Sequence, residues 1–345
     1  MGVEPAVEYT SITEALAGVG RYTAVVAATP WAALAPRLPA PTRLVVATTL
    51  EEIALDRLVA DEPDGDTIVG IGGGTACDVA KYLALRTGKA LVLVPTTTAT
   101  MAPYTIEVAR RVRRQVMWIG DVGGRVAVDL DLLASAPAAR NRSGAADIIA
   151  TASATWDWKL ADARDKGLPF STRLADIGAS CRRQLAEAAD AIAAGTPDGL
   201  RALVELQHGL GRACARAGHR RLVEGSEHTF AQANEHRLGS SSNHGAIVGL
   251  GTVAMCTLQE WYGVSAGGPS RREEAIELLT RCRVPSNPHQ LGLDEGTFRG
   301  LLRHAVRFHV GEFLPWSVLN EADVNWSAAE EMWRQVWKVP RTPDA

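Results

Sequence analysis

The sequence has few cysteines, little net charge and no long hydrophobic run, and each of these features argues against a class of protein. The cysteines are odd in number and scattered, at positions 77, 181, 214, 256 and 282, so we expect reduced thiols in a cytoplasmic protein rather than a disulfide framework. A formal net charge of −3 predicts no surface for nucleic acid or for an anionic membrane. The longest apolar run, residues 246–258, is too short to span a bilayer.

The first residues also lack the basic segment and apolar core of a secretory signal peptide, so none is expected. What the sequence does have is length and apolar content. Its 345 residues, 46% of them hydrophobic, are enough for two domains that each bury a core. No internal repeat is visible, which excludes solenoids and propellers.

The first half alternates short β-rich runs with helical stretches. Strands are predicted at residues 22–28, 43–47, 66–70 and 90–94, with helices between them, a hairpin over residues 105–120 and a last strand after it. This alternation is typical of a parallel, doubly wound sheet. We therefore predict an α/β domain over residues 1–137.

A glycine cluster lies where the third predicted strand passes into a helix. Gly72, Gly73 and Gly74 carry no side chains, so a pyrophosphate could approach their backbone N–H groups and the positive end of the next helix. The pattern is not GxGxxG, and a tight turn without a ligand is an equal alternative. Asp78 could hold this loop through its N–H groups, or could be an ordinary first-turn acid stabilised by the helix dipole.

A threonine-rich loop follows the apolar strand at residues 90–94. Ligands of open α/β sheets bind at the carboxyl ends of the strands. The hydroxyls of Thr96, Thr97 and Thr100 are therefore candidate partners for a ribose, a carboxamide or a phosphate. The alternative is a capped turn that uses these hydroxyls itself.

The second half, residues 138–345, loses the strand pattern and is predicted to be all α-helical, with a cleft between the two domains. Helical periodicity covers residues 147–163, 172–194, 199–218, 246–261, 271–283, 295–309 and 326–337. The segment 246–261 is apolar almost all round, as expected of a helix at the centre of a bundle.

Two histidines in this half stand at predicted helix starts. His228 and His244 are joined by a helix and a Gly/Ser-rich turn, residues 239–242, and Asp147 supplies a carboxylate upstream. Two imidazoles and one carboxylate suit Zn²⁺ or Fe²⁺ with a position left open for a substrate oxygen. A single histidine in a helical segment is more often structural, so the prediction depends on the three residues together.

The motifs GIGGGTACDVAKYLA, VPTT, SGAAD, DWKLA, EGSEH and HGAIVGLGT occur in this order. Together they resemble the superfamily of iron-containing alcohol dehydrogenases and dehydroquinate synthases, and most of all its sn-glycerol-1-phosphate dehydrogenase group. The resemblance spans roughly residues 20 to 315. EGSEH followed by a helix that begins HGAIVG is specific, whereas either motif alone is not.

This resemblance implies a fold, two cofactors and a reaction. NAD(H) or NADP(H) would bind the Rossmann-like domain, and one divalent Zn, Fe or Ni ion would bind Asp147, His228 and His244. The cation would polarise a carbonyl oxygen and stabilise the alkoxide that forms when hydride arrives from the nicotinamide. The expected enzyme is an oxidoreductase that reduces a small polyol-type ketone or aldehyde, including phosphorylated ones, and forms homo-oligomers.

The chain departs from the pattern of its relatives near the expected substrate. Met101 stands where the loop usually carries an Asp, and Gln232 stands four residues after the first metal His, where a second His is usual. Residues 27–29 provide no acid for the ribose hydroxyls, which permits NADPH. We therefore expect an altered substrate, with His236 as a replacement acid/base. The alternative is that His236 is structural or exposed to solvent.

Two other functions compete with this prediction. One is a redox-neutral lyase or cyclase of the dehydroquinate-synthase type, which keeps NAD bound and oxidises and then re-reduces one substrate carbon. The other is a non-catalytic descendant that binds a nucleotide or metabolite as a scaffold. The intact trio of possible metal ligands argues against the scaffold.

Overall fold

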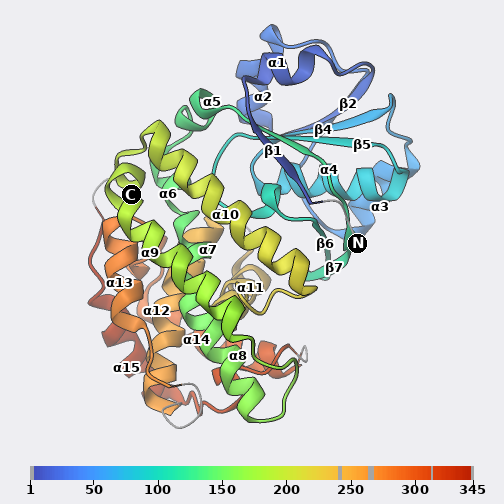
Figure 1. Ribbon diagram of the computed structural model, residues 1–345. Coiled ribbons are helices and arrows are strands. Elements are labelled where there is room, and N and C mark those ends of the chain that lie inside the picture. Colours follow the sequence, from blue (N-terminus) through green and yellow to red (C-terminus); the bar gives the residue numbers. More distant parts are fainter. Residues whose placement is uncertain (1–3, 240–242, 263–267, 312–313, 343–345) are drawn as a thin grey trace. The chain divides into compact units, whose positions relative to one another are not determined.

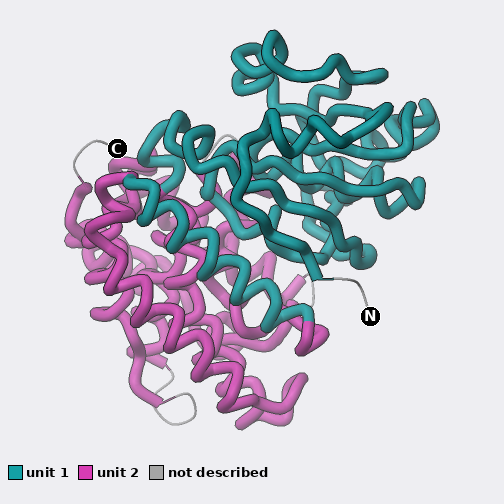
Figure 2. Tube along the Cα trace, turned by 45° about the horizontal axis from the view of Figure 1, so that its top comes forward, with its two compact units in different colours: residues 1–141, 196–215 teal, residues 142–195, 216–345 magenta. Residues whose placement is uncertain are grey.

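The computed structural model describes residues 4–239, 243–262, 268–311 and 314–342. The chain forms two compact units (Figure 2). One contains Met1–Asn141 and Thr196–Ala215, and the other contains Arg142–Gly195 and Arg216–Ala345. The helix α10 (Pro197–Ala217), predicted as part of the helical half, lies almost wholly in the first unit, because its Leu200 and Val204 pack into the core of that unit.

The first unit is built on a six-stranded sheet in which every neighbouring pair is parallel. The strands are β1 (Ala6–Tyr9), β2 (Tyr22–Val26), β3 (Arg43–Val46), β4 (Thr67–Gly72), β5 (Ala90–Pro95) and β8 (Arg125–Val128), in the order β1-β8-β5-β4-β2-β3. The predicted doubly wound α/β fold is confirmed (Figure 1). The edge strand β1 was not predicted.

Each face of this sheet has its own core, since side chains alternate along the strands. Leu91 and Leu93 of β5 pack with residues of α4 (Gly74–Thr87), α10 and Leu55 of α3 (Glu52–Ala60). Val92 and Val94 pack on the other face, with residues of α1 (Ile12–Ala17) and Leu34 of α2 (Ala28–Leu34). Helices on both faces explain why β5 is apolar throughout.

The predicted hairpin is also present in the first unit. It consists of β6 (Glu107–Val112) and β7 (Gln115–Asp121), which pair antiparallel. The short helices α5 (Leu130–Ala134) and α6 (Ala138–Arg142) follow β8.

The second unit contains helices and no strand among its described residues, as predicted for the second half. Its helices are α7 (Ala145–Ile149), α8 (Thr151–Ala163), α9 (Thr172–Ala194), α11 (Ser226–Leu238), α12 (His244–Tyr262), α13 (Arg272–Arg281), α14 (Glu295–Gly311) and α15 (Trp326–Trp337). The single helix predicted over residues 147–163 is two helices that meet at Ala150.

The helix α12 forms the centre of the second unit. Its residues 245–259 are all buried, and it contacts α7, α8, α11, α13 and α15. This burial agrees with the apolar surface predicted all round this helix. The described helices include none whose length and apolarity would suffice to cross a membrane. All five cysteines are buried and free.

Candidate metal and cofactor sites

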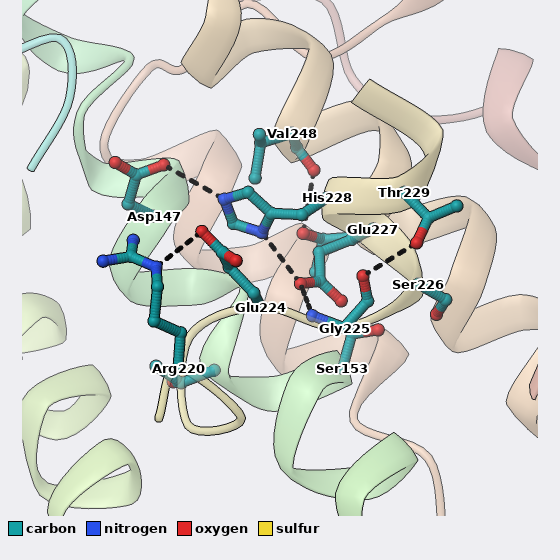
Figure 3. A network of polar contacts seen from close by, with 12 residues as sticks. Asp147, Ser153, Arg220, Glu224, Gly225, Ser226, Glu227, His228, Thr229 and Val248 are labelled. Carbon is teal, nitrogen blue, oxygen red and sulfur yellow. Dashed lines mark hydrogen bonds and ion pairs between the residues drawn. The ribbon is translucent and has the colours of Figure 1, made fainter. Parts of the chain in front are cut away.

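Asp147, His228 and His244 lie together in the second unit. Each offers a ligand atom, and these atoms lie within 4.8 Å of one another. The Nε2 atom of His228 is 3.9 Å from Oδ1 of Asp147, and the rings of the two histidines have centroids 5.8 Å apart. Figure 3 shows Asp147 and His228 facing each other. Three elements separated in sequence therefore bring together the three residues that the sequence singles out.

Each of the three residues lies at or near the start of a helix. Asp147 is in the first turn of α7, His228 is the third residue of α11, and His244 is the first residue of α12. Asp147 is 2% and His228 8% exposed, whereas the His244 side chain is 38% exposed. Residues 240–242 of the predicted turn lie outside the described residues.

Two further carboxylates surround His228. Glu227 is fully buried, and its Oε1 lies 2.9 Å from His228 Nδ1. Glu224 accepts a hydrogen bond of 2.8 Å from Nε of Arg220. Burial lowers the pKa of His228, but the hydrogen bond and charge of Glu227, with the charges of Glu224 and Asp147, outweigh it and raise that pKa. The surroundings of this imidazole therefore favour positive charge.

The turn before α11 is held by another buried carboxylate, Asp157 of α8. Its Oδ2 accepts hydrogen bonds from the backbone N–H (2.8 Å) and the hydroxyl (2.6 Å) of Ser226, and its Oδ1 accepts one from Val318 N–H (2.9 Å). Burial, and then the charge of Glu227, raise the pKa of Asp157 to about 6. This residue belongs to the DWKLA motif, so the motif has a structural role in fixing the start of α11.

His236, the tentative acid/base, takes part in a different contact. Its Nδ1 lies 3.2 Å from Nε2 of His304 in α14, and the two rings stack with centroids 5.3 Å apart. The metal-ligand trio does not include it. Its acid/base role stays a prediction.

The glycine cluster forms a strand-to-helix turn in the first unit, as predicted. Gly72 ends β4, Gly73 precedes α4 and Gly74 begins it. A Cβ atom at Gly73 would lie 3.3 Å from Cγ2 of Thr97, and one at Gly74 would lie 2.8 Å from Cγ2 of Thr100. The glycine turn and the threonine loop therefore form one corner at the carboxyl ends of β4 and β5.

The threonines of this corner already make hydrogen bonds within the unit. The Thr97 hydroxyl donates to Oδ1 of Asn141 (2.9 Å) and accepts from Ala99 N–H (3.2 Å), whereas the Thr100 hydroxyl accepts from Ala102 N–H (3.3 Å). The backbone N–H of Thr96 donates to Gly72 O (2.9 Å). Thr97 therefore uses its hydroxyl within the turn, as the capped-turn interpretation expects. A role of the three threonines toward a cofactor stays a prediction.

Asp78 forms an ion pair with Lys81, with Oδ1 and Nζ 3.2 Å apart. The Lys81 side chain is 1% exposed, and its Nζ also donates to the carbonyl oxygens of Ala102 (2.9 Å) and Glu107 (2.7 Å). The two residues therefore tie α4 to the segment after β5, which includes Met101. In this ion pair the partner of Asp78 belongs to its own helix and not to the glycine loop.

Sequence reasoning missed the carboxylates that surround His228 and its helix start, namely Glu224, Glu227 and Asp157. Glu224 and Glu227 were part of the motif EGSEH, but only the burial and the hydrogen bonds show their relation to the imidazole. The sequence offered one signal of this relation, namely that Glu224 and Glu227 stand close to the candidate ligand His228.

Comparison with solved structures shows the class of fold. A probable glycerol dehydrogenase from Sinorhizobium meliloti 1021 superposes with a TM-score of 0.72 at 20% identity, covering 98% of both chains. Maleylacetate reductase from Rhizobium sp. strain MTP-10005 gives 0.70 at 14% identity, covering 99% of this chain and 98% of that one. The sequence model described as "Iron-containing alcohol dehydrogenase" matches residues 38–137.

The chain belongs to the iron-containing alcohol dehydrogenase family. Within that family it is similar to glycerol-1-phosphate dehydrogenase [NAD(P)+] of Hyperthermus butylicus, with 31% identity over 270 residues, 77% of this chain and 73% of that protein. The corresponding protein of Aeropyrum pernix is 28% identical over 292 residues, 83% of this chain and 77% of that protein. The chain is accordingly an NAD(P)-dependent dehydrogenase that uses a divalent metal.

Proposed function

We propose that this enzyme uses NADH or NADPH to reduce a small polyol-type ketone or aldehyde, phosphorylated ketones included, at a metal held by Asp147, His228 and His244. The observation that carries the proposal is the trio itself, whose ligand atoms lie within 4.8 Å of one another on three different helices. The similarity to glycerol-1-phosphate dehydrogenases supports the substrate class.

The donor set fits a divalent cation. Two imidazoles and a carboxylate are borderline ligands that accept zinc, iron or nickel. Glu227 and Glu224 add negative charge beside His228, and Arg220 offsets part of it. The more exposed His244 leaves one side of the trio open, as a substrate oxygen requires. A structural site would instead supply four protein ligands, whereas three are found together here among the described residues.

A bound divalent metal supplies Lewis-acid stabilisation of the negative charge that grows on the substrate oxygen. The protein residues aim the ligands and hold the cofactor. Glu227 fixes the His228 ring, and α7 presents Asp147 from a buried turn. In the first unit, the turn Gly72–Gly74 would let a pyrophosphate reach backbone N–H groups at the start of α4, with Thr96, Thr97 and Thr100 beside it.

The substrate is proposed to differ from that of the glycerol-1-phosphate dehydrogenases. Met101 is 4% exposed and precedes the short 3₁₀ helix Ala102–Tyr104, so the position that carries an Asp in the resembled enzymes is apolar and buried here. Gln232 on α11 replaces the expected second histidine. Both changes remove a group that could carry a proton or a charge.

The experiment is a cofactor-oxidation assay on metal-reconstituted protein. NADH or NADPH is offered with dihydroxyacetone phosphate and then with a panel of ketoses and aldehydes, with His244→Ala as the inactive control. We expect turnover that is lost in the variant. The metal content of the purified protein, with Asp147→Ala for comparison, identifies the ion and tests the trio independently of turnover.

Each outcome separates the candidate functions. Turnover of dihydroxyacetone phosphate would assign the glycerol-1-phosphate activity, and turnover elsewhere in the panel would assign a different substrate. Tightly retained NAD without net turnover would favour the redox-neutral lyase or cyclase. Absence of any affinity for NADH and NADPH, or equal metal content in the Asp147→Ala variant, would contradict the proposal.

A further inference from the structure

Glu227 is a buried carboxylate of the second unit whose hydrogen bonds are incomplete. The residue is fully buried, and its Oε1 accepts the backbone N–H of Gly225 (2.7 Å) and lies 2.9 Å from His228 Nδ1. Its other oxygen, Oε2, is buried and has no hydrogen-bond partner among the described residues. A buried carboxylate oxygen left unsatisfied costs folding free energy. Stability alone therefore does not account for a carboxylate at this position.

The contact with His228 favours one of the two neutral tautomers of its ring. An ionised carboxylate can only accept hydrogen bonds, and Oε1 of Glu227 already accepts the backbone N–H of Gly225. With Glu227 ionised, Nδ1 of His228 is therefore the donor in their contact. In the neutral ring the lone pair is then on Nε2. This is the nitrogen that lies 3.9 Å from Asp147 Oδ1, on the side of the other candidate ligands.

The turn that carries Glu227 is itself enclosed by carboxylates. Asp157 holds Ser226 by two hydrogen bonds, and a Cβ at Gly225 would lie 2.8 Å from Asp157 Oδ2 and 2.9 Å from Glu227 Oε2. Both carboxylates therefore lie against Gly225, where a side chain has no room. Figure 3 shows Gly225 next to Glu227 at the start of α11. This packing fixes the start of α11, and with it the backbone position of His228.

We propose that Glu227 is a positioning residue: it holds His228 in the tautomer with the proton on Nδ1 and aims Nε2 at the site shared with Asp147 and His244, while Asp157 fixes the turn from which both residues start. The inference rests on the metal site of the proposed function. An outer carboxylate on a metal-binding imidazole orients the ring and increases its basicity. The alternative is that Glu227 only stabilises the helix start as a first-turn acid.

The variants Glu227→Gln and Glu227→Ala separate these two roles. Glutamine can still accept the Nδ1 proton without the negative charge, whereas alanine removes both the acceptor and the charge. Glu274→Gln is the matched control, because Glu274 is a carboxylate of α13 that pairs with the buried Arg182 (2.8 Å) in the same unit. The probe is Co²⁺, titrated into metal-free protein in competition with a chromogenic chelator.

We expect Co²⁺ affinity to fall about 10- to 100-fold in Glu227→Ala and by less in Glu227→Gln. The affinity of Glu274→Gln should equal that of the wild type, although its melting temperature falls. Unchanged affinity in a folded Glu227→Ala protein would overturn the proposal. If the alanine variant does not fold, the test is the Co²⁺ affinity of Glu227→Gln, which should be lower than that of wild type and of Glu274→Gln. Equal affinities would overturn the proposal.

The second readout needs no metal. In metal-free wild type labelled with nitrogen-15 histidine, NMR at alkaline pH should show His228 with its proton on Nδ1, and Glu227→Ala should lose this preference. A wild-type His228 protonated on Nε2 would overturn the proposal. Failure of the wild type to bind Co²⁺ would instead contradict the proposed metal site, while the tautomer would still test the role of Glu227.

Discussion

Gly245 lies so close to Ser143 that a Cβ atom built on it would be 2.2 Å from the Ser143 carbonyl oxygen. Gly245 follows His244 at the start of α12, and Ser143 precedes the helix that carries Asp147. The contact therefore sets how closely two of the three candidate ligands approach. The glycine of the HGAIVG motif is explained by packing.

Gly245→Ala is expected to separate α7 from α12. The new Cβ would clash with the Ser143 carbonyl oxygen, which belongs to the backbone and cannot move aside as a flexible side chain can. The free energy of unfolding should therefore fall by about 1–3 kcal/mol, and the affinity for Co²⁺ should fall as well. Gly209→Ala is the control, because Gly209 is exposed in α10 with open space around its Cβ position. That change should stabilise by about 0.5–1 kcal/mol. Unchanged Co²⁺ affinity in Gly245→Ala would contradict the prediction.

Gly74→Ala is expected to weaken cofactor binding. Its Cβ would lie 2.8 Å from Cγ2 of Thr100 and would occupy the space in which a pyrophosphate meets the start of α4. The expected loss is about tenfold in NAD(P)H affinity, or 1.4 kcal/mol, measured by the fluorescence of the reduced cofactor.

The double variant Gly74→Ala/Thr100→Ser identifies the cause of that loss. Serine lacks the methyl group that the new Cβ would meet, so the clash within the protein is relieved. Affinity that stays low would show that the space at Gly74 belongs to the cofactor, and recovery to the wild-type value would show that it serves only the packing of the threonine loop.

Asp157 is expected to make the metal-free protein less stable as pH rises from about 4 to 6. Burial and the charge of Glu227 raise the pKa of Asp157 from 3.8 to about 6, so between these values the folded chain keeps a proton that the unfolded chain has lost. The resulting loss of unfolding free energy is complete above the folded-state pKa and amounts to about 3 kcal/mol.

Denaturant unfolding of wild type and Asp157→Asn across this pH range measures the effect. Asparagine offers one acceptor oxygen where Asp157 uses two, so the variant should be less stable at every pH. The readout is therefore the pH slope, which should be shallower in the variant. Equal slopes would show that another group carries the dependence.

His236→Gln is expected to leave the metal content unchanged, because His236 pairs with His304 rather than with the trio. The pH profile of kcat in this variant then tests the acid/base role, and His304→Gln controls for loss of the pair alone. A profile altered in His236→Gln and retained in His304→Gln would support that role. Loss of metal from His236→Gln would contradict the expectation.

The sheet was largely predictable because strands buried on both faces are continuous apolar runs, as in residues 91–94 of β5. The strand β1 was not, since it is four residues long, lies at the sheet edge and is partly exposed. Its place depends on pairing with β8, where Ala6 aligns with Arg125 far along the chain. No local pattern contains that information.

The trio was predictable because its residue types suit a metal and its motifs resemble those of a known family. The carboxylates beside it were not, because glutamates near a histidine are common in helical sequences. Only tertiary packing buries Glu227 and turns it toward Nδ1 of His228. The pairing of His236 with His304 likewise joins two helices whose contact the sequence does not show.

The chain passes from the first unit to the second and returns for residues 196–215 before it completes the second. On the ribosome, the core that includes Leu200 and Val204 must therefore wait until after residues 142–195 have emerged. The second unit begins to emerge before residues 196–215, but His228 and His244 emerge after them. The first unit is therefore not complete until part of the second has been synthesised. During synthesis, each unit must begin to fold while the other is still incomplete.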